Sequence, residues 1–227
     1  LHELLKNVSQ NCSLNGYFIG TCFNGLNIWN LLLNKEKDET YSIFDDNDNM
    51  IWSVKKLYDS NSFDNDETSL GLPIEIFQES INKRHIEYLV NFSYLQNEIE
   101  NYGFVKCPPE DLKKKHFNKA IDSFESMFNK MKDDVDKKQP DGPKESWYGD
   151  AFKMTQGEKK ISFLNNYFIF KKVRTVDIYV NKDGEEEIKD VIPEKTIKKH
   201  EEIDQNMNKK PKRKVKKLKK KIKLVKK

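Results

Sequence analysis

The chain has 227 residues, of which 36% are hydrophobic and 34% are charged, and its formal net charge is +4. This length and composition predict one domain with a modest core plus extensions. They exclude a protein that spans a membrane by helices, because no apolar run approaches the roughly 18 residues that such a helix needs. The three cysteines, Cys12, Cys22 and Cys107, form no CxxC pair. We therefore predict reduced thiols, no metal site and an intracellular location.

The first 25 residues predict a helix followed by a strand. Apolar residues recur at the helical spacing i, i+3, i+4, i+7 over residues 1 to 8, and Asn15-Gly16 marks the end of that helix. The apolar run Tyr17 to Ile19 is typical of a strand that is covered on both faces in an α/β sheet. The sequence starts without Met and already inside this helix, so we expect upstream strands of a doubly wound domain to be missing.

The middle of the chain predicts alternating helices and strands. We expect a helix at 26–33, a hairpin at 41–44 and 50–57, a short strand or bend at 73–77, a helix at 87–102 and a strand at 104–107. A polar, acidic loop is expected at 60–69. Gly103 lies where a helix C-cap belongs.

The second half predicts a helix, a loop, a strand and a hairpin. A strongly periodic helix is expected at 117–131 and a flexible loop at 137–143. A helix that ends near Asn165 should lead into a strand at 167–171. The Asp-Gly turn at 183–184 predicts a hairpin between 176–180 and 185–191.

Four segments together resemble the mRNA cap guanine-N7 methyltransferases. They are GYFIGT at 16–21, EYLVNF at 87–92, WYGDAFKM at 147–154 and YFIF at 167–170. The third resembles the capping enzymes of large DNA viruses in particular. The resemblance covers residues 1–173 and implies the C-terminal half of a class I, Rossmann-like methyltransferase fold. Residues 174–195 would then be a hairpin extension and residues 196–227 a basic, disordered tail.

The resemblance implies methyl transfer from S-adenosylmethionine to the N7 atom of the cap guanine. Guanine N7 has a free lone pair, so alignment and electrostatics suffice and no acid or base residue is needed. The glycine-rich turn that binds the donor in such folds is absent, since no two glycines are separated by a single residue. We therefore expect the chain alone to bind no donor and to be inactive.

The resemblance implies two residues that bind the cap guanine, Glu87 and Tyr167, and cation–π attraction suggests a third, Trp52. The resemblance places Glu87 in the cap pocket, where a carboxylate can accept from both N1–H and the exocyclic amine of guanine. The alternative is a helix N-terminal carboxylate that interacts with the macrodipole. Tyr167 resembles a tyrosine that lines the same pocket, or it is an ordinary strand aromatic. Trp52, or less favourably Phe44, would give an aromatic wall for the methylated base; the alternative for both is hairpin core.

The loop expected at Thr21 to Gly25 lies where ligands bind in open α/β sheets, beyond the carboxyl end of a strand. Phe23 stands where the resembling family commonly has proline, so no role is assigned to Asn24. The four histidines are scattered and are predicted to be surface or interface residues: His2, His85, His116 and His200.

Charge is distributed unevenly along the chain. Residues 209–227 hold 13 of the 41 Lys and Arg residues and no Asp or Glu, which leaves 28 cations and 37 carboxylates, a net charge of −9, over residues 1–208. Such a tail predicts disorder in isolation and binding to nucleic-acid phosphates. The alternative is a solvated tail for solubility or nuclear targeting.

Two other function classes remain open. The chain could be a non-catalytic module that binds cap or RNA, or half of another class I methyltransferase that acts on a protein or a small molecule. Under the favoured interpretation its partner is the capped 5′ end of RNA. Triphosphatase and guanylyltransferase domains would precede it, and it would work in a cytoplasmic viral factory or virion, or in the nucleus of a cell.

Overall fold

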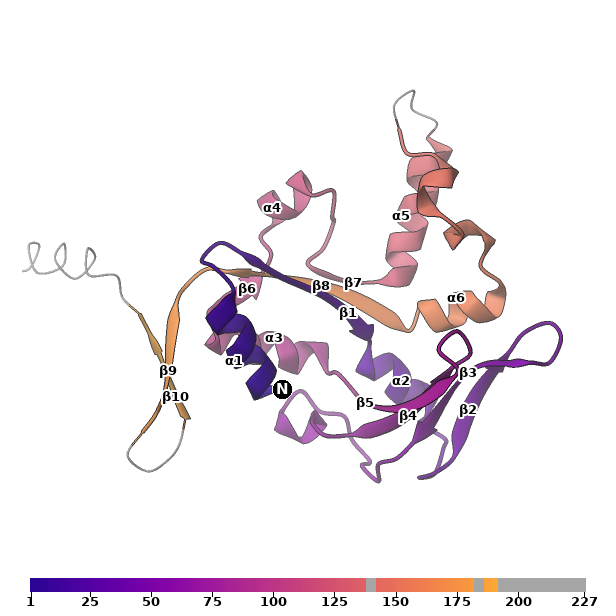
Figure 1. Ribbon diagram of the computed structural model, residues 1–227, viewed down its shortest axis with the longest axis horizontal. Helices are drawn as coiled ribbons and strands as arrows, with labels where there is room; N and C mark the ends of the chain where they lie inside the picture. The colour runs from indigo at the N-terminus through magenta and orange to yellow at the C-terminus, as the bar shows by residue number, and fades with distance from the viewer. Residues whose placement is uncertain (138–141, 182–185, 192–227) are drawn as a thin grey trace, which may run out of the picture. The chain divides into compact units, whose positions relative to one another are not determined.

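The computed structural model describes residues 1–137, 142–181 and 186–191, and the chain up to Asp190 forms one compact unit (Figure 1). The described residues form two four-stranded sheets and a two-stranded hairpin, all with antiparallel pairing. Helices pack against both larger sheets. The expected mixture of α and β structure is therefore confirmed, whereas a methyltransferase fold in particular stays a proposal.

The first sheet is built around β8 (Asn165–Lys172). β1 (Tyr17–Phe23) pairs with one side of it along its full length, from Tyr17 opposite Lys171 to Phe23 opposite Asn165. β6 (Phe104–Lys106) and β7 (Ile121–Ser123) share its other side. Within the described residues, the outer edge of β1 has no strand partner.

Helices cover both faces of this sheet. α1 (His2–Asn11) and α3 (Phe92–Asn101) lie on one face, and α4 (Pro109–Lys114) and α5 (Phe124–Asp136) lie on the other, as Figure 1 shows. Because neighbouring strand residues point to opposite faces, Phe168 and Phe170 pack under α1 and α3 while Tyr167 and Ile169 pack on the opposite side.

A buried lysine ties α1 to the sheet. The side chain of Lys172 is on the α1 face of β8, only 5% exposed, and its Nζ donates to the carbonyl oxygens of Ser9 and, at 2.9 Å, Cys12. These carbonyls lie at the C-terminal end of α1, where a positive charge also complements the helix dipole. The ammonium group therefore satisfies backbone acceptors that would otherwise be left unpaired.

The second sheet has the strand order β2 (Thr40–Phe44), β3 (Met50–Lys56), β4 (Pro73–Gln78), β5 (Lys83–Tyr88). Its inner face packs on α2 (Gly25–Leu31) and buries four side chains to 1% exposure or less: Trp52, Val54, Ile74 and Ile76. α6 (Gln156–Ser162), which begins with a capping box formed by Thr155 and Glu158, contributes Ile161 to the same core.

The remaining described elements are short. Three 3₁₀ turns occur at Glu67–Ser69, Glu145–Tyr148 and Ala151–Lys153. β9 (Val176–Val180) and β10 (Glu186–Asp190) form the predicted hairpin, and Ile178 and Ile188 pack against the α1 side of the first sheet. The turn of this hairpin, part of the predicted loop at 137–143 and the tail at 196–227 lie outside the described residues.

Two predicted helices begin later than their periodicity suggests. The helix expected from Glu87 begins at Phe92, because Asn91 accepts hydrogen bonds from the amides of Ser93 and Tyr94 as its N-cap. Similarly, the helix expected from Phe117 begins at Phe124 behind the N-cap Ser123. In both cases the preceding residues instead pair as strands, β5 with β4 and β7 with β8.

The predicted burial of β1 on both faces is wrong. Ile19, in its middle, is 59% exposed and lines an open groove on the α5 face of the sheet. The strand also continues to Phe23, so the loop expected at Thr21 to Gly25 shrinks to Asn24 before α2 begins. Among the described residues, no helix combines the length and apolar character needed to cross a membrane.

Candidate functional site

Three segments that are distant in sequence meet at the end of β1. The amide of Asn24 donates to the carbonyl of Leu164, 2.8 Å away, and the amide of Gly25 donates to the carbonyl of Val90, 3.0 Å away. A Cβ atom on Gly25 would lie 2.5 Å from that carbonyl oxygen, so only glycine allows this approach. The junction therefore joins the residues that follow β1, follow β5 and precede β8.

The inner face of β5 brings two polar residues to this junction. His85 and Glu87 pair with Ile76 and Ile74 across the sheet, and paired residues point to the same face. Their side chains are 34% and 38% exposed, whereas both isoleucines are 1% exposed. The pair therefore lies at the margin of the second sheet's core, within reach of solvent.

The carboxylate of Glu87 is held by His85. His85 Nε2 lies 2.8 Å from Glu87 Oε1. An ionised carboxylate only accepts hydrogen bonds, so Nε2 must carry the proton and donate. In the part of the chain that the structure describes, the other oxygen, Oε2, has no hydrogen-bond or ion-pair partner.

The pKa of the Cys22 thiol, near the end of β1, responds to the charge of this carboxylate. Burial first, and then the charge of Glu87, raise the pKa of the Cys22 thiol to about 11. The thiol is therefore neutral near pH 7 and is no thiolate nucleophile. Glu87 itself lies three residues before Val90, whose carbonyl accepts from the amide of Gly25 after β1.

The structure settles one of the two alternatives for Glu87. The residue lies in β5, ahead of the N-cap Asn91, and not at the start of α3. The alternative of a carboxylate that interacts with the helix macrodipole is therefore wrong. Its role in a cap pocket stays a prediction.

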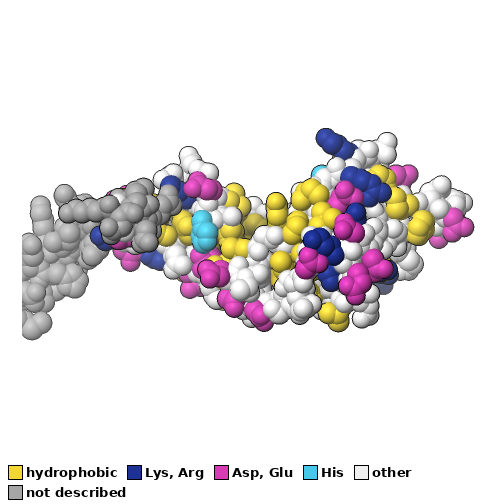
Figure 2. Space-filling view, turned by 90° about the horizontal axis from the view of Figure 1, so that it is seen from below, with side chains coloured by type: hydrophobic (Ala, Val, Ile, Leu, Met, Phe, Trp, Pro, Cys, Tyr) yellow, Lys and Arg dark blue, Asp and Glu magenta, His cyan; other side chains and the backbone are white. Residues whose placement is uncertain are grey.

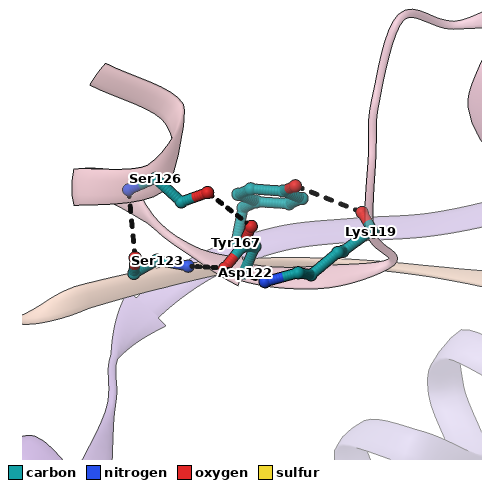
Figure 3. Close-up of polar contacts among 5 residues, drawn as sticks. All are labelled: Lys119, Asp122, Ser123, Ser126 and Tyr167. Carbon is teal, nitrogen blue, oxygen red and sulfur yellow. Dashed lines mark hydrogen bonds and ion pairs between the residues drawn. The ribbon is translucent and has the colours of Figure 1, made fainter. Parts of the chain in front are cut away.

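Tyr167 lies on the other face of the first sheet from Cys22 and Glu87. In the register, Thr21 is opposite Tyr167 and Cys22 is opposite Asn166, so Tyr167 and Cys22 point to opposite faces. The ring is 7% exposed, and its hydroxyl donates to the carbonyl of Lys119 at 3.1 Å (Figure 3). Burial, followed by the charge of Asp122, raises its pKa. The structure does not bring Tyr167 and Glu87 into one pocket.

Asp122 is the centre of the polar cluster beside Tyr167. It accepts hydrogen bonds from the amide of Ser123 at 3.0 Å, the hydroxyl of Ser126 at 2.6 Å and the ammonium of Lys119 at 3.3 Å (Figure 3). Burial alone would raise the pKa of this carboxyl, but these three donors outweigh burial and hold the pKa below its usual range. The cluster thus fixes the connection between β7 and α5.

An apolar groove of about 500 Å³ lies on this same face, between β1, β8 and α5. Its lining includes Ile19, Thr21, Phe124, Met127 and Tyr167. Tyr167 therefore presents its ring to an apolar groove, with its hydroxyl already bonded. The groove is distinct from the Glu87 junction on the opposite face.

The two aromatic residues of the β2–β3 hairpin differ in burial. Trp52 is 0% exposed and packs 5.9 Å from the ring of Phe23, which agrees with the hairpin-core alternative. Its ring offers no free face to a ligand. Phe44, by contrast, is 52% exposed at the edge of the sheet and is not core. Asn24 is the N-cap of α2, since its side chain accepts from the amide of Leu26 at 3.0 Å.

One face of the described residues mixes both signs of charge. On the face drawn in Figure 2, Asp and Glu side chains lie interspersed with Lys and Arg side chains, and hydrophobic side chains gather between them. The run of positive charge in the sequence, residues 209–227, lies outside the described residues.

Sequence patterns missed His85 as part of this site. A helix was expected over Glu87, and helical spacing would separate residues 85 and 87 onto different faces. In a strand the same spacing of two residues puts both side chains on one face. Recognising 83–88 as a strand would have revealed the pair.

Fold and site together define a mixed α/β protein with two larger antiparallel sheets. Near the junction between them lies the carboxylate of Glu87, with one oxygen hydrogen-bonded to His85. No family model matches the sequence. The chain is 27% identical over 190 residues to a protein of Acanthamoeba polyphaga mimivirus described as a probable mRNA-capping enzyme. The match covers 78% of this chain but only 16% of that protein, so the chain spans less than a fifth of its relative's length.

Proposed function

We propose that this chain is the cap-recognising part of an mRNA guanine-N7 methyltransferase. Its similarity to a probable mRNA-capping enzyme supports a function in mRNA capping. The finer assignment, to methyl transfer at N7, rests on the resemblance of four segments to the N7-methyltransferases. An intracellular location and binding to capped RNA go with this proposal.

One observation carries the proposal most strongly. The segments GYFIGT, EYLVNF and YFIF lie roughly 70 residues or more apart in sequence, yet their strands or flanking residues converge at the junction after β1. Glu87, the acidic residue of the second segment, is there with one carboxylate oxygen unpartnered among the described residues. The resemblance implies that Glu87 binds the cap guanine, and its free oxygen near this junction supports that role.

The chemistry of guanine suits such a carboxylate. Its N1–H and exocyclic amine lie on one edge of the base, and both are donors, whereas N7 and O6 lie on another edge. A carboxylate that accepts from the first edge leaves N7 free to attack the methyl group. Adenine presents an acceptor at N1 and would be refused. S-adenosylmethionine would be bound by polypeptide outside this chain, because the chain has no glycine-rich turn.

The direct test is binding of cap dinucleotides to the full chain. We expect GpppA to bind more tightly than ApppA, and Glu87→Gln to weaken GpppA binding by on the order of 1–3 kcal/mol, because an amide donor would face guanine's donors. Isothermal titration calorimetry gives both affinities. Glu75→Gln is the matched control, since Glu75 lies on the outer face of the same sheet in an ion pair with Arg84. Equal affinity for GpppA and ApppA would contradict the proposal.

We also propose that the basic tail binds RNA phosphates without selecting the cap. Residues 209–227 contain 13 cations and no aromatic side chain, so they offer charge but no surface on which bases stack. Deleting them should weaken RNA binding at low salt and flatten its salt dependence, while the preference for capped over uncapped RNA persists. Filter binding over a salt series measures the slope, and an unchanged slope would favour targeting or solubility instead.

A non-catalytic cap-binding module is the second candidate, favoured by the absence of a donor-binding motif. The two candidates separate when the chain is joined to the upstream polypeptide. Methyl transfer to GpppA by the joined protein supports the enzyme, and cap binding without transfer supports the module. Titration of the chain alone with S-adenosylmethionine should show no micromolar affinity, because the glycine turn is missing.

A further inference from the structure

The strand geometry of β5 singles out a second residue of the guanine site. His85 lies two residues before Glu87, on the same face of an edge strand. On the opposite face, Arg84 pairs with Glu75 at 3.1 Å and lies over the ring of Phe77. The inner face of β5 therefore carries one polar pair, whereas its outer face contributes Arg84 to a separate pair with Glu75 of β4. Only the inner pair lies near the junction.

The contact between His85 and Glu87 restricts the carboxylate. A free glutamate rotates about three side-chain torsions, the last of which turns its terminal carboxylate. The hydrogen bond from Nε2 to Oε1, at 2.8 Å, fixes the position of one oxygen and thereby the plane of the carboxylate.

Two-point recognition of guanine needs such restriction. Accepting from N1–H and the exocyclic amine together requires both carboxylate oxygens to lie near the plane of the base. A rotating carboxylate can still meet one donor but rarely meets both. Oε1 keeps a second lone pair after accepting from His85, so both oxygens remain able to accept from the base.

We propose that His85 is a positioning residue that orients the Glu87 carboxylate for simultaneous recognition of N1–H and the exocyclic amine of guanine. This inference rests on the proposed function and goes beyond it by assigning the second hydrogen bond to a preorganised carboxylate. His85 acts through Glu87 and does not touch the base. The predicted signature is a loss of discrimination between guanine and hypoxanthine, which lacks the exocyclic amine.

The test compares GpppA with IpppA, whose inosine carries hypoxanthine, on the full chain. We expect the native chain to prefer GpppA by roughly three- to tenfold, the contribution of one hydrogen bond. His85→Ala should reduce this preference to less than twofold while leaving IpppA binding nearly unchanged. His85→Gln, whose amide can still donate to Oε1, should restore most of the preference. Arg84→Ala, on the outer face, should leave it intact.

The possible outcomes separate the two proposals. If Glu87→Gln leaves GpppA binding unchanged, the proposed function fails and the role of His85 falls with it. If Glu87→Gln abolishes the preference for GpppA but His85→Ala keeps it, only the positioning role is overturned. If circular dichroism shows that His85→Ala unfolds the chain, His85→Gln becomes the deciding variant. A retained preference for GpppA over IpppA then supports the positioning role, and a lost preference in a folded chain contradicts it.

Discussion

Two carboxylates beside the first sheet, Asp122 and Glu87, differ in how fully their oxygens are used. Asp122 accepts from Ser123, Ser126 and Lys119, and its side chain is 13% exposed. Glu87 accepts from His85 alone within the described residues, and its side chain is 38% exposed. A buried acceptor normally finds its partners inside the protein, so full satisfaction indicates a structural role.

The number of hydrogen bonds that each carboxylate accepts indicates which of the two is free to bind a ligand. Asp122 accepts three hydrogen bonds that hold the turn between β7 and α5, and a ligand would have to compete with those donors. Glu87 keeps capacity free, beside backbone contacts that already join β1, β5 and β8. Asp122 belongs to β7 of the first sheet and Glu87 to β5 of the second. If Glu87 has the proposed role in recognition, substitutions at the two carboxylates should have different effects.

The largest expected effect belongs to Trp52, which the structure puts on the structural side of this comparison. Because its ring is 0% exposed in the core of the second sheet, Trp52→Ala should lower the free energy of unfolding by about 3–5 kcal/mol. Urea denaturation followed by circular dichroism measures this. Trp147→Ala is the control, since Trp147 is 65% exposed and should cost about 0.5 kcal/mol or less. A loss as small as that of the control would show that Trp52 is not core.

Exchanging the two acids for their amides should give opposite patterns. Asp122→Asn removes acceptor capacity from a satisfied cluster and should lower the free energy of unfolding by about 1–3 kcal/mol, with GpppA affinity unchanged. Glu87→Gln should leave the free energy of unfolding nearly unchanged and weaken GpppA binding instead. Urea denaturation and calorimetry on both variants check the pattern. Weakened GpppA binding in a folded Asp122→Asn variant would break the comparison.

The smallest expected effect is a pH dependence from Asp122. Its pKa is lowered in the folded chain, so the ionised carboxylate stabilises the fold above its usual pKa of about 3.9. This contribution is lost as the pH falls through the lowered folded value. The Asp122→Asn variant should therefore lose less stability than the native chain between about pH 5 and pH 2. If the native chain and the variant lose the same stability over this pH range, Asp122 is not the source of the pH dependence.

Local signals in the sequence predicted most of the elements. The Asp-Gly turn gave the β9–β10 hairpin, and the run at residues 17–19 gave β1. Gly103 adopts a φ of 90°, as expected for a residue that ends a helix. These features depend on a few neighbouring residues, and that is why they can be predicted from sequence.

Non-local pairing decided what the sequence did not predict. Helical periodicity over 87–102 and 117–131 gave way where β4 paired with residues 87–88 and β8 paired with residues 121–123. The motif at 87–92 identified Glu87, but His85 became visible only once β5 was a strand. The separation of Tyr167 from Glu87 depends on the register of β1 against β8, which no local pattern encodes.

The pairing of β1 with β8 also has a consequence for the order of events during synthesis. β1 leaves the ribosome roughly 140 residues before its partner, a delay on the order of ten seconds at ~5–20 residues per second. The second sheet, whose strands lie between residues 40 and 88, can assemble from its hairpins within that interval. The junction around Glu87 is therefore completed only when β8 arrives, so premature termination before residue 165 would leave β1 unpaired and the site unformed.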